Sequence, residues 1–367
     1  MSMKAVVLHG KEDLRIETVA IPTPGPGQVL IRNGYAGICG SDLHAIFAPE
    51  ALGLSATEPH SVTGSTLPQI LGHEFAGTIE AVGEGVDIEV GVRAAIYPTY
   101  ACGECPACRK GRENACARIG FHGLSSDGGG MAEFTVVDAY RIHPLPDGVD
   151  VKMGALVEPM SVAWHATTRG EVTANSTALI VGAGPIGIGV YFALKAQGLT
   201  RVLVSEPSAE RRALLTNLGA AVVDPVNEDL QARVAELTGG HGVDVAFDAA
   251  GAPVAFQSTL PLLAPAGRLV VVALYERTVD LQPSLLALGE RDIVGTMAYL
   301  PEDFDAVIQA MASGVYDFTG WVETIGVDDI HSAVERLRSG AGAKILVSAE
   351  ASRDTTTAAQ ENLATVG

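Results

Sequence analysis

From Thr177 to Gly295, short apolar segments alternate with segments of helical pattern, and this alternation restricts the possible folds more than any other feature of the sequence. It is typical of a parallel, doubly wound α/β sheet, because each parallel strand needs a long connection back across the sheet. We therefore expect residues 159–297 to form one such domain. The predicted strands are Ala178–Val181, Arg201–Ser205, Ala221–Val223, Val243–Phe247, Arg268–Ala273 and Asp292–Gly295.

A glycine-rich turn follows the first of these strands and opens a helix. Gly182 permits a tight turn, Gly184 lets the backbone approach a pyrophosphate, and Gly187 allows close packing of helix on strand. The free N–H groups of the helix N-terminus attract the anion. A glycine pattern alone is weak evidence in a chain with 42 glycines, but here it stands between a strand and a helix. The turn reads Gly182, Ala183, Gly184, Pro185, Ile186 and Gly187, which fits G-x-G-x-x-G.

Glu206 stands at the end of the second predicted strand, about 20 residues beyond the glycine turn. A carboxylate at this position accepts hydrogen bonds from the adenosine ribose and repels a 2′-phosphate, so NAD is favoured over NADP. The alternative is an ordinary surface glutamate. Arg211, one turn into the next helix, is also placed to touch the ribose or a phosphate.

The charge balance and the cysteines narrow the class of protein. With 24 Lys and Arg against 43 Asp and Glu, the net charge is −19, which disfavours nucleic acid and anionic membranes as partners. The apolar stretch Ala178–Ala196 has nearly the length of a membrane span, but its four glycines and Pro185 favour a strand, a turn and a helix. The N-terminus lacks a secretory pattern, and five cysteines do not suit a disulfide framework. We expect a cytoplasmic protein.

Two regions flank the α/β domain. Residues 1–158 contain short apolar runs separated by Gly and Pro, which predicts an irregular β-rich domain, and its long loop from about Ala45 to Gln69 is functional or disordered by its length. Residues 298–350 return to that domain, and 351–367 form a polar tail. Predicted strands are Ala5–Leu8, Gln28–Arg32, Gly77–Val82, Arg93–Tyr97, Ala132–Val137 and Lys344–Ser348; predicted helices are Glu302–Ser313 and one from near Asp328.

Four cysteines lie close together in the lobe 100–117. Four thiolates complete the tetrahedral coordination of Zn²⁺ and leave no open position, which indicates a structural site. The alternative is an iron–sulfur cluster, but bacterial ferredoxins have a shorter gap before the fourth cysteine and a proline after it. The lobe has few apolar residues, so the metal is expected to stabilise it. The four residues are Cys102, Cys105, Cys108 and Cys116.

Three other segments carry side chains that bind metals. Cys39 precedes Gly-Ser-Asp-Leu-His, His73 and Glu74 lie between glycines, and Glu158 precedes a proline. Each has an ordinary interpretation as well. An isolated cysteine is more often a small buried hydrophobic residue. His73 and Glu74 are compatible with an ordinary pair at the surface, and Glu158 is compatible with a partner in a salt bridge. Their occurrence together with a dinucleotide fold and a zinc lobe favours a catalytic metal site.

These motifs resemble the zinc-dependent medium-chain dehydrogenases. The similar segments are CGSDLH, LGHEFAG, CGECPACRKGRENAC, VEPMSVAWHA and the glycine turn GAGPIG, and the resemblance extends from about residue 3 to 348. Within the family the chain looks most similar to the (R,R)-2,3-butanediol dehydrogenases, with the sorbitol and threonine dehydrogenases as neighbours. The resemblance implies a GroES-like catalytic domain and a Rossmann domain.

The resemblance also implies roles for individual residues. Cys39, His73 and Glu158 would be ligands of the catalytic zinc, and Glu74 either a fourth ligand or a neighbour that alternates with water. Ser41 and His44 resemble the proton relay of the family, and Asp42 resembles the carboxylate that orients the histidine ligand. The loop 45–69 does not match the usual spacer of the family, so the substrate is less well defined than the chemistry.

The charges of the implied ligands suit this chemistry. One thiolate, one carboxylate and a neutral imidazole bring Zn²⁺ to a formal charge of zero and leave a position open. A substrate hydroxyl bound there becomes a stronger acid, and the resulting alkoxide passes hydride to the nicotinamide. We expect oxidation of a secondary alcohol in a vicinal diol, of the 2,3-butanediol/acetoin type, with a sorbitol-like polyol or threonine as alternatives.

A protein of another class is the remaining alternative. A redox sensor or another non-catalytic NAD-binding protein would keep only the structural zinc, whereas the enzyme needs two zinc ions per chain. The resemblance further implies a homodimer or homotetramer.

Overall fold

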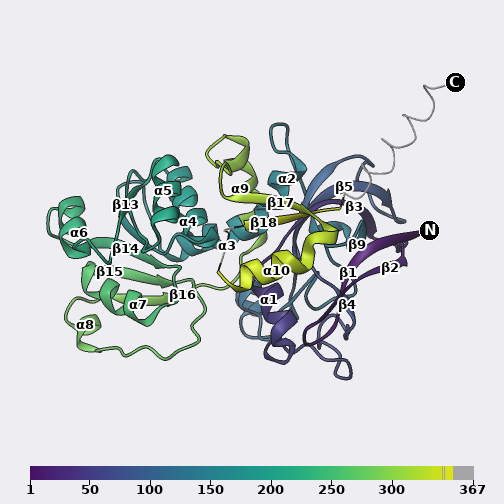
Figure 1. Cartoon of the computed structure of the whole chain (residues 1–367), viewed down its shortest axis with the longest axis horizontal. Coiled ribbons are helices and arrows are strands. Elements are labelled where there is room, and N and C mark those ends of the chain that lie inside the picture. Colours follow the sequence, from purple (N-terminus) through teal and green to yellow (C-terminus); the bar gives the residue numbers. More distant parts are fainter. Residues whose placement is uncertain (341, 343, 350–367) are drawn as a thin grey trace. The chain divides into compact units, whose positions relative to one another are not determined.

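The computed structural model describes residues 1–340, 342 and 344–349, and the chain divides into two compact units (Figure 1). One unit is Met1–Glu158 together with the described residues from Trp321 on, and the other is Pro159–Gly320. The predicted return at residue 298 therefore differs from the observed division after Gly320, because α9 (Pro301–Ala312) contacts α4 (Pro185–Ala196) of the α/β unit. The tail 351–367 lies outside the described residues.

The α/β unit contains the expected parallel sheet of six strands in the order β13-β12-β11-β14-β15-β16. The strand order reverses between β11 and β14, which is where a doubly wound sheet binds ligands at the carboxyl ends of its strands. The strands are β11 (Thr177–Val181), β12 (Arg201–Ser205), β13 (Ala221–Val223), β14 (Val243–Asp248), β15 (Leu263–Val271) and β16 (Asp292–Gly295). The helices besides α4 and α9 are α5 (Ala209–Asn217), α6 (Leu230–Thr238), α7 (Pro253–Thr259) and α8 (Ser284–Ala287).

The other unit is built on β-sheets, as expected for a GroES-like domain. A seven-stranded sheet has the order β10-β6-β5-β3-β18-β17 with β9 paired to β3, and a smaller sheet joins β2, β1 and β4. The strands are β1 (Ser2–Gly10), β2 (Asp13–Ala20), β3 (Gln28–Gly37), β4 (Gln69–Ile70), β5 (Glu74–Val82), β6 (Arg93–Ile96), β7 (Thr99–Tyr100), β8 (Gly120–Phe121), β9 (Phe134–Asp138), β10 (Ile142–Pro144), β17 (Val322–Gly326) and β18 (Lys344–Ser348).

The helices of this unit are α1 (Gly40–Phe47), α2 (Val151–Gly154) and α10 (Ile330–Arg338), while α3 (Val157–Arg169) crosses the boundary between the units. β18 lies beside β3, so the end of the described chain is part of the central sheet and contributes Ile345 and Val347 to its core. The long loop begins with α1 and a short 3-10 turn, Pro49–Leu52. Within it, His60 accepts hydrogen bonds at Nδ1 from the N–H groups of Val62 and Thr63. In the part of the chain that the structure describes, no helix is long and apolar enough to cross a membrane.

Candidate active site and cofactor site

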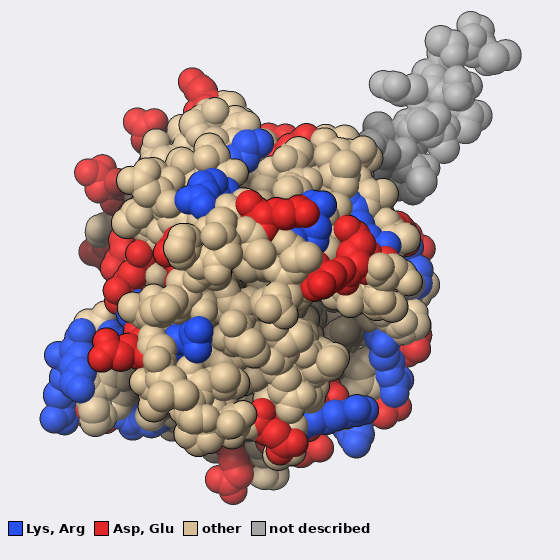
Figure 2. Space-filling model, turned by 90° about the vertical axis from the view of Figure 1, so that its left-hand side faces the viewer, with Lys and Arg blue, Asp and Glu red and all other residues tan. Residues whose placement is uncertain are grey.

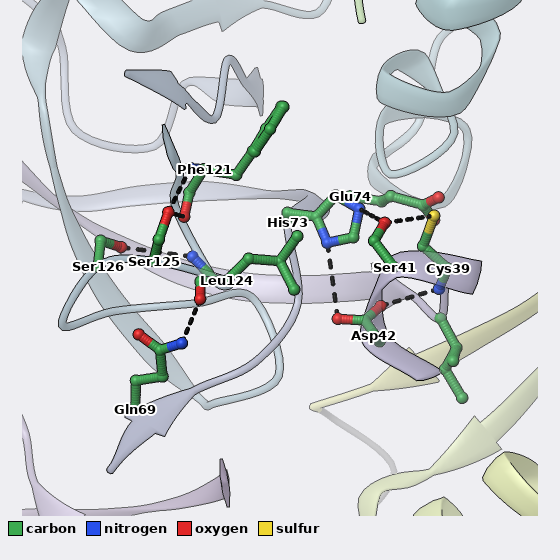
Figure 3. A network of polar contacts seen from close by, with 12 residues as sticks. Cys39, Ser41, Asp42, Gln69, His73, Glu74, Phe121, Leu124, Ser125 and Ser126 are labelled. Carbon is green, nitrogen blue, oxygen red and sulfur yellow. Dashed lines mark hydrogen bonds and ion pairs between the residues drawn. The ribbon is translucent and has the colours of Figure 1, made fainter. Parts of the chain in front are cut away.

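Two segments of the β-rich unit bring three possible metal ligands together. Cys39 is the residue before α1, His73 lies immediately before β5, and Glu74 is the first residue of β5. The pairing of Gly37 in β3 with Glu74 in β5 places these segments side by side. The ligand atoms of Cys39, His73 and Glu74 lie within 4.8 Å of one another, and their side chains converge in Figure 3.

The start of α1 also positions Asp42 and Ser41 against this group. Asp42 accepts a hydrogen bond from the N–H of Cys39 at 2.8 Å, and its other oxygen lies 3.6 Å from Nδ1 of His73. Ser41 Oγ lies 3.1 Å from the sulfur of Cys39 and 3.3 Å from Nε2 of His73 (Figure 3). The carboxylate of Asp42, expected to orient the histidine ligand, and the hydroxyl of Ser41 therefore both lie beside the candidate ligands.

The electrostatics of the group favour a cation. Burial alone would lower the pKa of His73, but the negative charge of Asp42 and the contact with Cys39 outweigh it and raise this pKa well above its usual value. Nδ1 of His73 and Oδ1 of Asp42 are buried without a hydrogen-bond partner. A thiolate, an imidazole and a carboxylate are ligands of catalytic zinc sites. The residues present therefore fit a zinc ion.

Lys344, which the sequence did not single out, is the ionic partner of Glu74. Its ammonium group forms an ion pair with Glu74 and donates a hydrogen bond to the carbonyl of Ile38 at 3.0 Å. Lys344 and Glu74 are only 3% and 1% exposed. Burial alone would lower the pKa of Lys344, but the negative charges of Glu74 and Cys39 outweigh it and raise this pKa. A Cβ atom on Gly37 would collide with the Glu74 carboxylate, so glycine makes room for the pair.

The remaining candidates are less closely grouped. Glu158, at the start of α3, is buried, and its charge also acts on Lys344. Among the described residues, however, its carboxylate is not part of the group of ligand atoms within 4.8 Å. His44 is exposed on α1, and the described chain shows no hydrogen bond between it and Ser41. The ring of Phe121, another residue that the sequence did not indicate, packs edge-on against His73 at 6.2 Å between centroids.

The four cysteines of the lobe form a second, separate group. Their sulfur atoms lie 3.4 Å apart for Cys102 and Cys116, 3.5 Å for Cys105 and Cys108, and 3.9 Å for Cys102 and Cys108. Sulfur atoms about 2.3 Å from one zinc ion in a tetrahedron are separated by roughly 3.8 Å. Hydrogen bonds from the backbone of Glu104 and from Arg118 lower the pKa of Cys102 to about 6. The cluster thus fits a structural zinc.

The glycine turn has the geometry that a dinucleotide requires. Gly182 has a φ of +97°, and a Cβ atom there would lie 3.1 Å from the backbone of Ala249 and Ala250. Nothing lies within 4 Å of the position a Cβ would take at Gly184, so the backbone is open to a ligand. Gly187 packs so closely against the carbonyl of Gly182 that a side chain has no room.

Glu206 lies beside this turn. It is 4% exposed, and its carboxylate accepts hydrogen bonds from the N–H of Ala183 at 2.7 Å and of Ser208 at 2.8 Å. The carboxylate therefore also holds the glycine turn, which the sequence did not predict. Arg211 is half-buried, and it is its neighbour Arg212 that binds the carbonyl of Glu206 at 2.7 Å and pairs with Asp224.

Known proteins share both units. A family model described as an alcohol dehydrogenase GroES-like domain matches residues 25–147, and one described as a zinc-binding dehydrogenase matches 185–313. The chain is 38% identical to the (R,R)-butanediol dehydrogenase of Bacillus subtilis strain 168, over 89% of this chain and 94% of the relative. It is 33% identical to the sorbitol dehydrogenase of the same strain, over 91% and 93%.

A solved structure agrees. The crystal structure of 2R,3R-butanediol dehydrogenase from Bacillus subtilis matches with a TM-score of 0.87 and 37% identity, covering 95% of this chain and 99% of that chain. The chain therefore belongs to the zinc-binding dehydrogenases of the medium-chain alcohol dehydrogenase family. It is a zinc-binding, NAD-dependent alcohol oxidoreductase, and the family resemblance seen in its sequence is confirmed.

Proposed function

We propose that this enzyme interconverts a secondary alcohol in a vicinal diol and the corresponding hydroxyketone, of the 2,3-butanediol/acetoin type, with NAD. The observation that carries the proposal is the group of the partly buried Cys39 with the buried His73 and Glu74, in a chain similar to a butanediol dehydrogenase over nearly its whole length. A sorbitol-like polyol is the second candidate, because the similarity to a sorbitol dehydrogenase is nearly as extensive. Threonine is a third candidate, from the resemblance of the sequence.

Cys39, His73 and Glu158 would hold the catalytic zinc. When bound, the metal supplies a Lewis acid that makes a substrate hydroxyl more acidic, and NAD accepts the hydride. Asp42 fixes the orientation of His73. Ser41, whose hydroxyl touches both Cys39 and His73, receives the proton of the substrate and passes it toward His44, which is exposed to solvent. Glu74 would stay paired with Lys344 while substrate is bound, and its carboxylate would be available as a further metal ligand in the absence of substrate.

The test is NAD reduction with the separate stereoisomers of 2,3-butanediol, with sorbitol and with threonine, together with the zinc content of the purified protein. We expect the highest kcat/KM with one 2,3-butanediol stereoisomer and two zinc ions per chain. Turnover of sorbitol or threonine with at least equal efficiency would contradict the choice of substrate. One zinc per chain and no turnover would revive the non-catalytic NAD-binding protein.

We further propose a homodimer or homotetramer. β16 is an outer strand of the parallel sheet, and the apolar side chains of Leu288, shortly before it in the sequence, and Met297, shortly after it, are exposed. Light scattering of the purified protein tests this. A cytoplasmic location remains a prediction from the cysteines, and small-molecule substrates remain the predicted partners. The face drawn in Figure 2 carries its basic side chains in separate groups among acidic ones, an arrangement that does not favour polyanions.

A further inference from the structure

Asp248, the last residue of β14, is a buried carboxylate that the reaction does not use. It has no exposed surface. One oxygen accepts hydrogen bonds from the N–H groups of Ala250 at 3.0 Å and Gly251 at 3.2 Å. The other accepts a hydrogen bond from the hydroxyl of Tyr275, which lies in the segment after β15. A buried carboxylate needs such partners, because an unpaired charge is unfavourable away from water.

The backbone of Asp248 joins the same two segments. Its carbonyl accepts hydrogen bonds from the N–H groups of Val272 and Ala273, both at 3.0 Å. Gly251 has a φ of +64°, and a Cβ atom there would lie 3.0 Å from the carbonyl oxygen of Leu274. The segment after β14 and the segment after β15 are therefore packed together, with Asp248 bonded to both.

This junction lies next to the glycine turn. The N–H of Ala249 donates to the carbonyl of Val181 at 2.9 Å, and Gly182 packs against Ala249 and Ala250. β11 and β14 are the strands between which the sheet order reverses, so the segments beyond their carboxyl ends border the crevice in which a doubly wound fold binds its dinucleotide. Any shift of residues 249–251 would be transmitted to the glycine turn.

Tyr275 is suited to hold this junction. Burial raises the pKa of its phenol, and the hydrogen bond to Asp248 raises it further, so the hydroxyl stays neutral and donates. Its ring packs perpendicular to that of Phe256, with 6.2 Å between the centroids. Ring and hydroxyl together leave the side chain little freedom. The tyrosine is the only one of the carboxylate's described partners that comes from another side chain.

We infer that Tyr275 is a positioning residue of the NAD site. Through Asp248 it fixes the backbone of residues 249–251 and 272–275 beside the glycine turn, in the arrangement that receives the dinucleotide. Its loss leaves the Asp248 carboxylate one partner short and loosens both segments. The inference rests on NAD binding and does not depend on which alcohol the enzyme oxidises.

The test compares Tyr275→Phe with Tyr191→Phe, whose hydroxyl also donates within the α/β unit, to the carbonyl of Leu218 at 3.4 Å. NADH affinity is measured by fluorescence titration without alcohol, and KM for NAD and kcat are measured at saturating alcohol. We expect Tyr275→Phe to raise the Kd of NADH and the KM of NAD about 3- to 10-fold, with kcat within about twofold, because one hydrogen bond to a charged group is lost. Tyr191→Phe should change none of the three by more than about twofold.

The double variant Asp248→Asn/Tyr275→Phe gives a second measurement. If the two residues act as one unit, the Kd of the double variant for NADH is no higher than that of Asp248→Asn alone. Additive effects would overturn the inference. So would an unchanged Kd for NADH in Tyr275→Phe, whether or not the melting temperature falls, because Tyr275 would then only stabilise the fold. A proposed function that fails in the alcohol screen leaves these NADH titrations unaffected.

Discussion

Replacing Lys344 by Met should expose the importance of its ion pair with Glu74. Both side chains are almost completely buried, at 3% and 1% exposure. Removing one partner of a buried pair leaves an uncompensated charge, which costs about 3–5 kcal/mol. The unit concerned spans Met1–Glu158 and the residues from Trp321 on, and for a domain of such size 1 kcal/mol corresponds to about 2–4 °C. We therefore expect the melting temperature of Lys344→Met to fall by roughly 6–20 °C.

Two further variants separate charge from packing. In Lys344→Met/Glu74→Gln both charges are absent, so most of the lost stability should return. Lys4→Met is the matched control, because Lys4 forms an ion pair with Asp328 that is 43% and 67% exposed on its two sides. Exposed pairs contribute about 0–1 kcal/mol, so its melting temperature should change by no more than about 4 °C.

The assay is differential scanning calorimetry of the zinc-loaded proteins, with the visible spectrum of the cobalt-substituted enzyme as a second readout. In Lys344→Met the unpaired Glu74 carboxylate should turn to the metal, which changes the cobalt spectrum and lowers kcat. The double variant should recover the original spectrum. If the double variant is as unstable as Lys344→Met, and the cobalt spectrum of Lys344→Met is the same as that of the parent enzyme, the reasoning from buried charge is refuted, and Lys344 acts through its packing alone.

Four further outcomes are expected. Glu206→Ala should raise the KM of NAD about tenfold or more and reduce the preference for NAD over NADP, because it removes both the proposed ribose acceptor and the hydrogen bond from Ala183. Steady-state kinetics with both cofactors check this, and an unchanged ratio of kcat/KM for NAD and NADP would contradict it. Cys105→Ser should release one zinc per chain and open the lobe 100–117 to protease before the rest of the chain, as limited proteolysis with mass spectrometry would show. His44→Ala should slow alcohol oxidation mainly at low pH, where bulk base is scarce, and an unchanged pH–rate profile would remove His44 from the relay. Burial and the charge of Arg141 lower the pKa of His122 to about 3. This pKa lies below that of histidine in the unfolded chain, so the neutral ring of His122 contributes its full stabilisation above about pH 6.5. Below that pH the free energy of unfolding decreases by about 1.4 kcal/mol for each pH unit. Urea unfolding of His122→Gln between pH 6.5 and 5.5 should show a shallower pH dependence than the parent, and equal slopes would assign the acid sensitivity to other groups.

The features that were predictable from the sequence are those that depend only on residues close together in the chain. The strands at Arg201–Ser205, Ala221–Val223 and Asp292–Gly295 have the observed bounds, because each is a short apolar run bounded by turn or charged residues. The cysteine lobe and the glycine turn are equally local: their ligands and dihedral requirements lie within a few positions of one another. Local patterns of this kind can be recognised without knowledge of the tertiary contacts.

Features that depend on distant contacts were missed. β2 (Asp13–Ala20) has no completely buried residue, so its sequence lacks the apolar run that marks an interior strand. Lys344 meets Glu74 only because β18 is inserted beside β3, and nothing near Lys344 in the sequence indicates a charged partner. The return to the first unit was placed at residue 298, because the apolar face of α9 alone does not show which core it joins.

The pair of Glu74 and Lys344 gives a physical reason for a carboxylate next to a zinc site that does not need it. On the proposed ligand set, the Cys39 thiolate and the Glu158 carboxylate already neutralise a divalent cation, and a third anion on the metal would make it a weaker Lewis acid. A buried carboxylate without a cation would be driven toward the metal or toward its neutral form. The ammonium group of Lys344 opposes both effects, because it balances the charge of Glu74 within the same buried space. On this proposal Glu74, paired with Lys344 beside the metal site, would be at hand to replace a departing substrate, while the electrophilic character of the zinc would be kept for the alcohol.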